Sequence, residues 1–485
     1  MRMTWKRFIV LVMLSVTFNT LAADILANSD KLTLTACHLD GIKEQVQCGK
    51  LTVPENYQQT SGEQIDINFA VLPAIDNSKN KAPLMFLAGG PGQAAVELSA
   101  VLRERFTEIR KTHDLILVDQ RGTGQSHPLQ CEDTNEQSIY EVIPEDYSEQ
   151  DIKDCIAQLT GDLSQYNSEN AIRDFDAVRA ALGHQQIHIY GGSYGTRAAL
   201  VYMRMFPESL KSVVLDSVGP IEVPIGLFGQ SSARSFNLLL SHCQQDLSCR
   251  KAYPNLESEF IQVLARLIKA PKQIAIAHPR LGTATSFVLS HDKFVGTLTT
   301  QLYGTATRSL VPLVIHQAFL ENYQPLIGLI ATTEGSQAIY VGLTMNIVCN
   351  EDMPKISPQM FIDDANNNFG GNTSHKAWQA ACPLWPQYRV NDDFYQPVTA
   401  NIPTLILSGD LDPVTPPSNG DKSAATLPNS HHIISKNNAH IVATTDCAIE
   451  IVSEFLETLD PKNVDESCLA EIPDETFMTS LNGSI

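Results

Sequence analysis

The sequence predicts an α/β protein in which a mainly parallel sheet, covered by helices on both faces, is interrupted by an inserted, mainly helical segment. Strand and helix patterns alternate over residues 168–215, and this order is typical of a parallel, helix-covered sheet. From about 218 to 400 the recognisable patterns are helical, and strand patterns return at 404–407. We therefore expect one α/β core formed by residues 23–217 and 401–485, with residues 218–400 as a helical cap.

The first part of the core begins with alternating apolar residues and continues with short apolar runs. Alternation over 65–71 indicates a strand with one buried face. The runs at 83–87 and 115–118 each end in a Gly-rich turn, as buried parallel strands do. A helix is expected from about Ser168 to a stop at Gly183, because apolar residues recur every three or four positions. A strand at 187–190, a helix at 196–206 and a strand at 212–215 follow.

The inserted segment and the second part of the core complete the predicted order. Helical patterns in the insertion include residues 236–243, 256–269, 310–329 and 338–348. After the strand at 404–407, a last strand is expected at 431–434. Residues near 190 and residues 412–440 should therefore meet at one edge of the sheet.

Composition excludes several other classes of protein. The chain has 485 residues, of which 43% are hydrophobic and 18% are charged, and this balance argues against disorder. It has 34 Lys and Arg against 54 Asp and Glu, a net charge of −20. Because phosphate binding depends on clustered Lys and Arg, nucleic acid is not an expected partner. We expect most of the acidic excess to form a solvated surface.

The N-terminal residues have the pattern of a secretory signal peptide. Basic residues precede an apolar run over 8–18, which is shorter than the ~20 residues that a membrane span needs. The run ends in small residues, so residues 1–22 are the predicted signal peptide, cleaved after Ala22. We expect an exported protein, periplasmic or extracellular, without a membrane anchor.

All ten cysteines follow the predicted signal peptide, and an even set in an exported chain indicates disulfides. Metal binding is the competing interpretation, but the sequence contains no Cys-x-x-Cys pair and the cysteines are not grouped with His. We therefore expect no metal site. The sequence alone does not determine the connectivity, although pairing neighbours gives the shortest loops: Cys37–Cys48, Cys131–Cys155, Cys243–Cys249, Cys349–Cys382 and Cys447–Cys468.

A serine lies between a predicted strand and a predicted helix. Ser193 is the centre of Gly191-Gly192-Ser193-Tyr194-Gly195, a Gly-x-Ser-x-Gly motif in the strand-turn-helix context that presents a nucleophilic serine. An ordinary glycine turn is the alternative, and the flanking strand and helix argue against it. We therefore expect Ser193 to be the nucleophile.

A serine nucleophile needs a base that is oriented by a carboxylate, and in this context the acid and the histidine follow in that order. Asp412 follows a predicted strand and His440 lies beyond the last one. Asp410 is the rival acid, but Asp412 is further from the strand and freer to turn toward the histidine. His431 and His432 are rival bases, but they fall within a strand, where packing or hydrogen bonding explains them.

The reaction also needs N–H donors for the oxyanion of the intermediate. Tyr194 can supply one, since it follows the nucleophile. The Gly-rich turn 88–92 after a parallel strand can supply another. Pro91 has no N–H group, so Gly90 is the candidate there.

Longer runs make the pattern more specific. The runs 89–92 (Gly-Gly-Pro-Gly), 119–126 (Asp-Gln-Arg-Gly-Thr-Gly-Gln-Ser), 191–196 (Gly-Gly-Ser-Tyr-Gly-Thr) and 412–416 (Asp-Pro-Val-Thr-Pro) occur in that order. Together with the helix over 171–183, they resemble the prolyl and tripeptidyl aminopeptidase family of α/β-hydrolases. The resemblance implies the α/β-hydrolase fold, the triad of Ser193, Asp412 and His440, and a cap of residues 218–400 over the active site. We expect the 119–126 loop to brace the site, with Arg121 paired to a carboxylate.

Two positions depart from that family. Ala88 stands where many prolyl aminopeptidases have histidine, and Ala439 precedes His440 where glycine is common. Neither departure removes a member of the predicted triad. The first departure, the export signal and the cysteines make the chain more similar to the secreted tripeptidyl-aminopeptidase branch.

An aminopeptidase must also bind a free α-amine, for which a partly buried carboxylate is the direct means. Glu351 and Asp352 follow Cys349 in a run that resembles the family's Cys-x-acidic element. The resemblance makes Glu351 the first and Asp352 the second candidate amine anchor, and a solvated helix end is the alternative. Trp385 can wall a substrate pocket or belong to the core.

The sequence thus favours an exported serine aminopeptidase of tripeptidyl or prolyl type, acting on peptides with a free N-terminus through an acyl-enzyme. It should need neither metal nor cofactor. A carboxylesterase or lipase is the alternative, because the same triad serves both chemistries. A non-catalytic binding protein of the same fold is a third hypothesis, against which the complete triad and oxyanion loop argue. The sequence does not indicate the oligomeric state.

Overall fold

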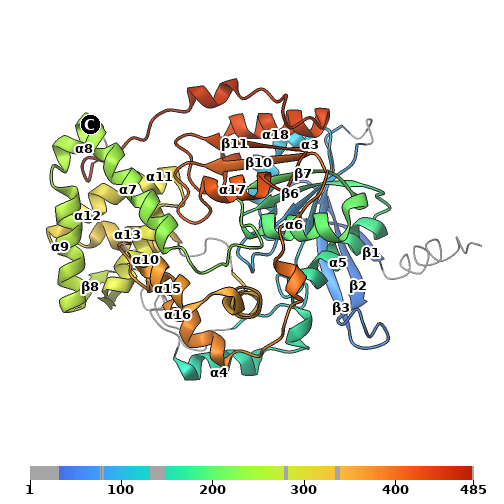
Figure 1. Ribbon diagram of the computed structural model, residues 1–485, viewed down its shortest axis with the longest axis horizontal. Helices are drawn as coiled ribbons and strands as arrows, with labels where there is room; N and C mark the ends of the chain where they lie inside the picture. The colour runs from blue at the N-terminus through green and yellow to red at the C-terminus, as the bar shows by residue number, and fades with distance from the viewer. Residues whose placement is uncertain are drawn as a thin grey trace, which may run out of the picture.

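A nine-stranded sheet with the strand order β1-β2-β3-β5-β4-β6-β7-β10-β11 forms the centre of the computed structural model (Figure 1). The structure describes residues 32–76, 78, 81–131, 148–277, 282–333, 339–366 and 368–482. The predicted signal peptide, residues 1–22, lies outside the described residues. The strands of the sheet are β1 (Leu32–Cys37), β2 (Val46–Pro54), β3 (Gln64–Leu72), β4 (Leu84–Leu87), β5 (Leu115–Val118), β6 (Ile187–Gly192), β7 (Leu210–Asp216), β10 (Thr404–Gly409) and β11 (Ser430–Ser435).

The sheet is antiparallel at one end and parallel over the rest. β1, β2, β3 and β5 pair antiparallel in that order, whereas β5, β4, β6, β7, β10 and β11 pair parallel. β7 pairs with β10, although the whole insertion separates them in sequence. The predicted strands are therefore confirmed, and the two parts of the core form one sheet.

Helices cover both faces of this sheet, as predicted. On one face the apolar sides of α5 and α6 pack through Ile172, Phe175 and Leu200. On the other face α3 and α18 pack through Ile109 and Phe455. The helices of the core are α2 (Ser99–Arg105), α3 (Thr107–Arg110), α4 (Glu149–Gln158), α5 (Ser168–Ala181), α6 (Tyr194–Met205), α17 (Pro417–Ala424) and α18 (Asp446–Thr458).

The insertion is mainly helical and lies to the left of the sheet in Figure 1. Its helices are α7 (Gly229–Gln245), α8 (Leu247–Ala252), α9 (Leu256–Lys269), α10 (His291–Gln301), α11 (Thr305–Arg308), α12 (Val311–Phe319), α13 (Gln324–Thr333), α14 (Val341–Ile347), α15 (Pro358–Ala365) and α16 (Thr373–Ala381). These helices have their own apolar core, which includes Phe236, Phe260, Phe294 and Ile315.

Two details of the insertion differ from the sequence-based expectation. The helix expected over 310–329 is two helices, α12 and α13, because the chain turns at Glu321, whose φ is 60°. The insertion also contains a hairpin of β8 (Lys272–Ala277) and β9 (Ala284–Leu289), which helical spacing did not predict. Buried residues of the hairpin, such as Phe287, alternate with exposed ones, but the exposed Ala275 and Val288 are apolar, so the sequence shows no clear alternation of apolar and polar residues.

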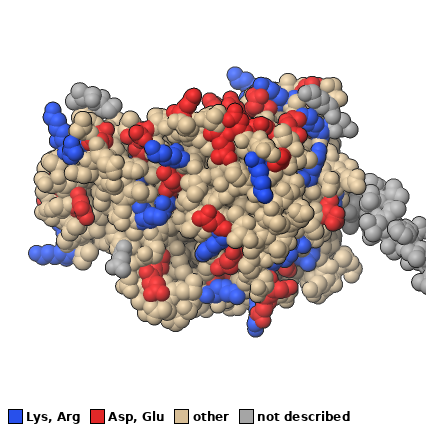
Figure 2. Space-filling model, turned by 45° about the horizontal axis from the view of Figure 1, so that its top comes forward, with Lys and Arg blue, Asp and Glu red and all other residues tan. Residues whose placement is uncertain are grey.

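All ten cysteines form the five disulfides between neighbours that gave the shortest loops: Cys37–Cys48, Cys131–Cys155, Cys243–Cys249, Cys349–Cys382 and Cys447–Cys468. Arg121 is fully buried and donates to both carboxylate oxygens of Asp174, at 2.6 and 2.7 Å, so the predicted carboxylate pair is also present. Many acidic side chains lie on the surface and gather near the top of the face shown in Figure 2.

The C-terminal segment connects the core to the insertion. After the disulfide at Cys468, it crosses the top of the molecule toward α7 and α8 (Figure 1). Glu475 pairs with Arg308 and His242 of the insertion, and the Met478 N–H donates to the Ser309 carbonyl at 3.1 Å. Phe477 is buried in the apolar core of the insertion. The end of the chain therefore holds the insertion against the core.

Candidate active site

Ser193 occupies a sharp turn between β6 and α6. Its backbone angles are φ 55° and ψ −123°, a region that a non-glycine residue rarely adopts. A Cβ on Gly191 would lie 2.3 Å from the Gly195 carbonyl oxygen, and a Cβ on Gly195 would lie 2.0 Å from the Leu87 carbonyl oxygen. Both glycines of the motif are therefore required by close backbone approach.

The predicted oxyanion donors lie beside this serine. Tyr194 is the first residue of α6, so helix geometry leaves its N–H without an intrahelical acceptor. The turn after β4 lies against the serine, because a Cβ on Gly89 would be 3.2 Å from the Ser193 Cβ. Gly90 has φ 109°, a conformation that favours glycine. The two candidate donors thus come from neighbouring strand ends.

The Asp412 side chain is fully buried, and both of its carboxylate oxygens accept hydrogen bonds. Oδ1 accepts the N–H groups of Val414 at 2.9 Å and Thr415 at 2.8 Å. Oδ2 accepts the Thr415 hydroxyl at 2.7 Å and His440 Nδ1 at 2.8 Å. Burial raises the pKa of Asp412, but the neighbouring His440 ring and these donors outweigh it and hold the pKa below its ordinary value.

His440 is oriented by this carboxylate. Burial lowers the pKa of His440, but the charge and hydrogen bond of Asp412 raise it by more than burial lowers it. The pKa therefore lies above its ordinary value. The main-chain N–H of His440 donates to the Tyr303 carbonyl at 3.0 Å. The next residue, Ile441, approaches the serine turn, since its Cδ1 would lie 3.3 Å from a Cβ on Gly192. The structure therefore brings the His440 loop beside Ser193, as the predicted topology requires.

The rival residues have other partners. Asp410 offers its carbonyl to Arg234, and its Oδ1 is buried without a hydrogen-bonding partner in the described part of the chain. His431 contacts Glu466 at 2.5 Å, whereas His432 contacts Asp421 at 3.0 Å and Ser408 at 2.9 Å. Asp412 and His440 are the candidates that the structure places together.

Asp216 positions the loop after His440. It is fully buried at the end of β7, and its carboxylate accepts the N–H groups of Val442 and Ala443, both at 2.9 Å, and the Tyr190 hydroxyl at 2.5 Å. Sequence reasoning did not single out this residue. Its place directly after a strand was the available signal, because carboxylates at strand ends gather at the site.

The insertion holds the loop that carries the acid. Three side chains of α7 donate to four consecutive carbonyls of this loop: Arg234 to Asp410 at 2.7 Å and Asp412 at 3.1 Å, Ser235 to Leu411 at 2.6 Å, and Ser232 to Pro413 at 3.1 Å. No sequence signal could have found these contacts, since α7 and the loop are far apart in the chain. We call Ser232, Arg234 and Ser235 the α7 clamp.

Glu351 lies in a π-helical turn, Val348–Asp352, that follows α14. Its buried carboxylate accepts the Ser168 N–H at 2.8 Å, the Ser168 hydroxyl at 2.5 Å and the Tyr388 hydroxyl at 3.2 Å. The Ser168 hydroxyl also contacts the Tyr194 hydroxyl at 2.9 Å. Burial raises the pKa of Glu351 to about 7. The buried Glu351 carboxylate is therefore connected through Ser168 to Tyr194, the residue that follows Ser193. The alternative of a solvated helix end is wrong.

Asp352 is buried beside it but has a cationic partner. Its Oδ1 accepts from Arg197 at 2.7 Å and from the Ile225 N–H at 2.8 Å. Its Oδ2 is buried with no hydrogen-bonding partner among the described residues. Burial raises the pKa of Asp352 above its ordinary value, although Arg197 lowers it.

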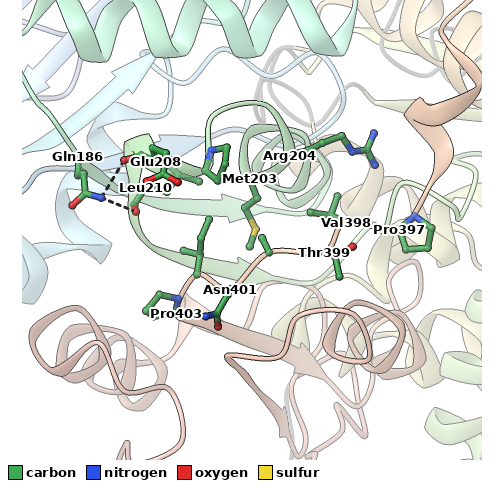
Figure 3. Close-up of a pocket in the computed structure, with 13 residues that line it drawn as sticks. Gln186, Met203, Arg204, Glu208, Leu210, Pro397, Val398, Thr399, Asn401 and Pro403 are labelled. Atoms are coloured by element: carbon green, nitrogen blue, oxygen red, sulfur yellow. Dashed lines mark hydrogen bonds between the residues drawn. The ribbon is translucent and has the colours of Figure 1, made fainter. Parts of the chain in front are cut away.

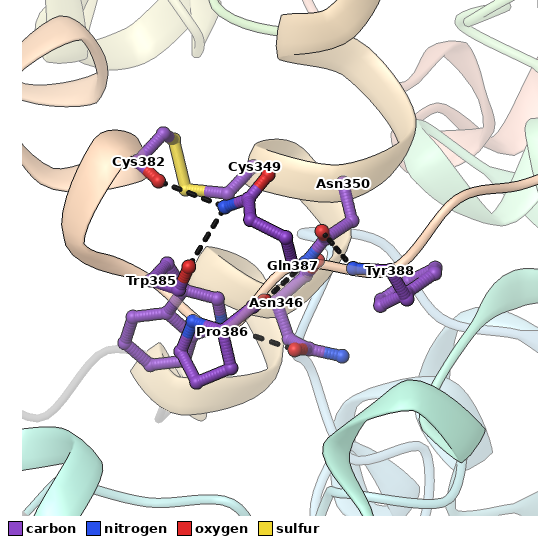
Figure 4. The surroundings of a disulfide bond; sticks show 8 residues. All are labelled: Asn346, Cys349, Asn350, Cys382, Trp385, Pro386, Gln387 and Tyr388. Atoms are coloured by element: carbon purple, nitrogen blue, oxygen red, sulfur yellow. Dashed lines mark hydrogen bonds between the residues drawn. A yellow bond between two sulfur atoms is a disulfide. The ribbon is translucent and has the colours of Figure 1, made fainter.

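The disulfide Cys349–Cys382 holds this turn (Figure 4). Trp385 is buried against the disulfide and its indole N–H donates to Asn346 Oδ1 at 3.0 Å. Asn350 Oδ1 accepts the Tyr388 N–H at 2.8 Å, which places the Tyr388 ring near Glu351. Trp385 therefore belongs to a core cluster that supports the Glu351 turn.

A cavity of about 600 Å³ lies away from this site (Figure 3). Gln186, Leu210 and Pro403, which line it, are at or just before the starts of β6, β7 and β10, whereas Ser193 follows the end of β6. The cavity is thus at the opposite edge of the sheet. Within the described residues, no group of three or more His, Cys, Asp or Glu is arranged to hold a metal ion. None of the described helices has the length and apolar character needed to cross a bilayer.

Comparison with known proteins identifies the fold to which this geometry belongs. One family model, alpha/beta hydrolase fold, matches residues 82–274, and a second, TAP-like protein, matches residues 367–468. The chain has the α/β-hydrolase fold. The chain is 30% identical to tripeptidyl aminopeptidase of Streptomyces lividans over 196 residues, 36% of each chain. It is 23% identical to serine protease Hip1 of Mycobacterium tuberculosis (strain ATCC 25618 / H37Rv) over 448 residues, 84% of each chain.

The first curated relatives are matched over about half of their length or less. The chain covers 48% of a relative from Escherichia coli and 36% of the Streptomyces lividans enzyme. Among solved structures, proline iminopeptidase of Mycobacterium smegmatis aligns over 85% of this chain and 98% of its own, with 15% identity and a TM-score of 0.41.

Proposed function

We propose that this α/β-hydrolase is an exported serine aminopeptidase that cleaves short peptides from a free N-terminus, of tripeptidyl or prolyl type. The observation that carries the proposal is the buried carboxylate of Glu351, connected through Ser168 to Tyr194 beside the nucleophile turn. An esterase has no need of a buried acid at this place, whereas an aminopeptidase must neutralise the ammonium group of its substrate.

In the proposed reaction Ser193 attacks the scissile carbonyl while His440 takes the hydroxyl proton. Asp412 holds the imidazole with Nδ1 protonated and stabilises the imidazolium. The N–H groups of Gly90 and Tyr194 stabilise the oxyanion. His440 then donates the proton to the leaving amine, and water, activated by the same histidine, hydrolyses the acyl-enzyme.

Glu351 is the first proposed amine anchor. The hydrogen bonds of its carboxylate come from Ser168 and Tyr388, both uncharged, so a substrate ammonium would supply the missing positive charge. Asp352 is the second anchor, because its Oδ2 is free to accept, although Arg197 already balances its charge. A buried carboxylate whose pKa is about 7 is ionised readily when a cation arrives.

Two further observations support the proposal. Relatives are named tripeptidyl aminopeptidase, serine protease and proline iminopeptidase, so peptide substrates are expected here also. The five disulfides support export to an oxidising compartment, periplasmic or extracellular. We propose further that residues 218–400 form a cap over the core of residues 23–217 and 401–485, and that peptide substrates enter between the two.

The test is a panel of matched peptides, each with a free and an N-acetylated terminus, whose products are identified by mass spectrometry. Cleavage of the free form only, lost in Ser193→Ala, is the expected result. Equal cleavage of both forms, or hydrolysis of simple esters but not of peptides, would contradict an aminopeptidase. Labelling of the wild type by a fluorophosphonate separately tests whether Ser193 is activated, which a non-catalytic binding protein would not need.

A further inference from the structure

A second, smaller pocket lies in the insertion next to His440. It has a volume of about 200 Å³, less than the roughly 300–1,000 Å³ of sites for drug-sized ligands, so it suits a single side chain. Its apolar walls are formed by Phe228 just before α7, Val295 on α10, Tyr303 just after α10, Phe369 in the turn before α16, and Val414 in the Asp412 loop.

The pocket shares two walls with the His440–Asp412 pair. The Tyr303 carbonyl accepts the main-chain N–H of His440 at 3.0 Å. The rings of these two residues meet edge to face, with their centroids 5.1 Å apart. The Val414 N–H donates to Asp412 Oδ1 at 2.9 Å. A group in this pocket therefore lies against residues that also position the catalytic base.

The chemistry of the walls selects an uncharged, apolar occupant. None of the described residues that line the pocket carries a charge. Most of the polar side chains in the walls are already bonded within the protein: Ser232 to the Pro413 carbonyl, Thr300 to the Gly296 carbonyl, Thr373 to the Gly370 carbonyl, Ser374 to Asp364, and Asn368 to Gly370 and Gly371. Few polar groups remain to offset the desolvation of a charged or strongly polar side chain.

We propose that this pocket binds an apolar side chain of the substrate residue just after the scissile bond. The inference rests on the proposed function and adds a specificity site to it. His440 must donate its proton to the leaving amine, so the leaving residue has to lie on the histidine side of Ser193. The pocket is walled by Tyr303, whose ring meets the His440 ring, and by Val414, which bonds Asp412, so it lies beside the histidine.

Gly296 provides the test. It lies on α10 and lines the pocket, and a Cβ at this position would meet no atom within 4 Å. A Gly296→Leu substitution therefore adds a side chain without a backbone clash and also favours the helix. Gly328, an exposed glycine on α13 that does not line the pocket, has the same open surroundings, so Gly328→Leu is the matched control.

Two free-amine peptides that differ only in having Leu or Gly just after the cleaved bond are compared in the wild type and both variants. We expect the wild type to favour Leu, and Gly296→Leu to lower the Leu-to-Gly ratio of kcat/KM by roughly tenfold or more. Gly328→Leu should leave the ratio within about twofold.

Two results would overturn the inference while leaving the proposed function intact. One is a Gly296→Leu enzyme that cleaves both peptides with the wild-type ratio. The other is a change of preference for the residue before the scissile bond instead of the one after it. A wild type that cleaves neither peptide contradicts the proposed function itself, and the wild-type measurement alone reveals that outcome.

Discussion

The guanidinium of Arg234, on α7 of the insertion, donates to the main-chain carbonyl of Asp412 at 3.1 Å and to that of Asp410 at 2.7 Å. It thus bonds the loop that carries the candidate acid without touching the carboxylate. Ser232 and Ser235 bond the carbonyls of the same loop. The position of Asp412 against His440 therefore depends on the insertion as well as on the core.

Replacing Arg234 should slow the chemical step more than it weakens substrate binding. Hydrogen bonds to a charged group contribute about 1.5–3 kcal/mol each, so Arg234→Met should lower kcat by roughly tenfold or more with KM little changed. Steady-state kinetics on a free-amine anilide measure both constants. Arg250→Met, an exposed arginine of α8, is the control and should behave as the wild type. A larger effect on KM than on kcat would contradict a positioning role.

The pH dependence of serine labelling should report His440. Because pairing with Asp412 raises the pKa of His440, and only the neutral imidazole can act as base, the labelling rate should rise with pH through a midpoint above about 6.5. Asp412→Asn removes the source of the upward shift, so the midpoint should fall and the maximal rate should drop by about 10⁴-fold. An uncharged fluorophosphonate measures this without involving amine recognition.

Asp410→Asn is the control for that experiment, since Asp410 follows the same strand and lies in the same loop. It should keep the wild-type midpoint. If Asp410→Asn shifted the midpoint and Asp412→Asn did not, the acid would be assigned to the wrong residue.

Glu351→Gln should impair binding of free-amine substrates. Loss of a charge-assisted contact predicts a rise in KM of roughly 10- to 100-fold, with kcat nearly unchanged. The ionised carboxylate is the form that binds an ammonium, so the wild-type KM should fall as pH rises through about 7. This dependence should vanish in Glu351→Gln. Glu259→Gln, another buried glutamate of the insertion, should retain it. A variant with unchanged KM would remove Glu351 from the site.

Removing the disulfide at Cys349 and Cys382 should affect both stability and binding. This bond joins residues 33 positions apart and supports the Glu351 turn. The double Ala variant should therefore lose about 2–4 kcal/mol of unfolding free energy. We also expect its KM for free-amine peptides to rise. Chemical denaturation and steady-state kinetics measure the two effects.

The double Ala variant of Cys243 and Cys249 is the comparison, because that disulfide closes a separation of only 6 residues and lies elsewhere in the insertion. It should lose less stability and keep the wild-type KM. Equal changes in KM for the two variants would show that the Cys349–Cys382 bond has no specific relation to Glu351.

The sequence by itself determined the parts of this protein that depend on local pattern. Alternating and unbroken apolar runs predicted the strands of the core. Gly191 and Gly195 form a recognisable motif around Ser193, because the close approach of the backbone requires glycine at both positions. The order of strands also predicted that the His440 loop would reach the Ser193 turn. Hairpin β8–β9 and the break between α12 and α13 were missed, because neither has a strong periodic signal.

Only the tertiary structure decided the contacts between distant segments. Three such contacts are those of the α7 clamp, those of Asp216 with the His440 loop, and that of Glu351 with Ser168. In each, the separation in sequence carries no information about the distance in space. Burial also decides the charge state, since the same carboxylate has an ordinary pKa in water and a pKa of about 7 in the Glu351 turn. Local sequence specifies elements and motifs, whereas packing determines which side chains share a low-dielectric site.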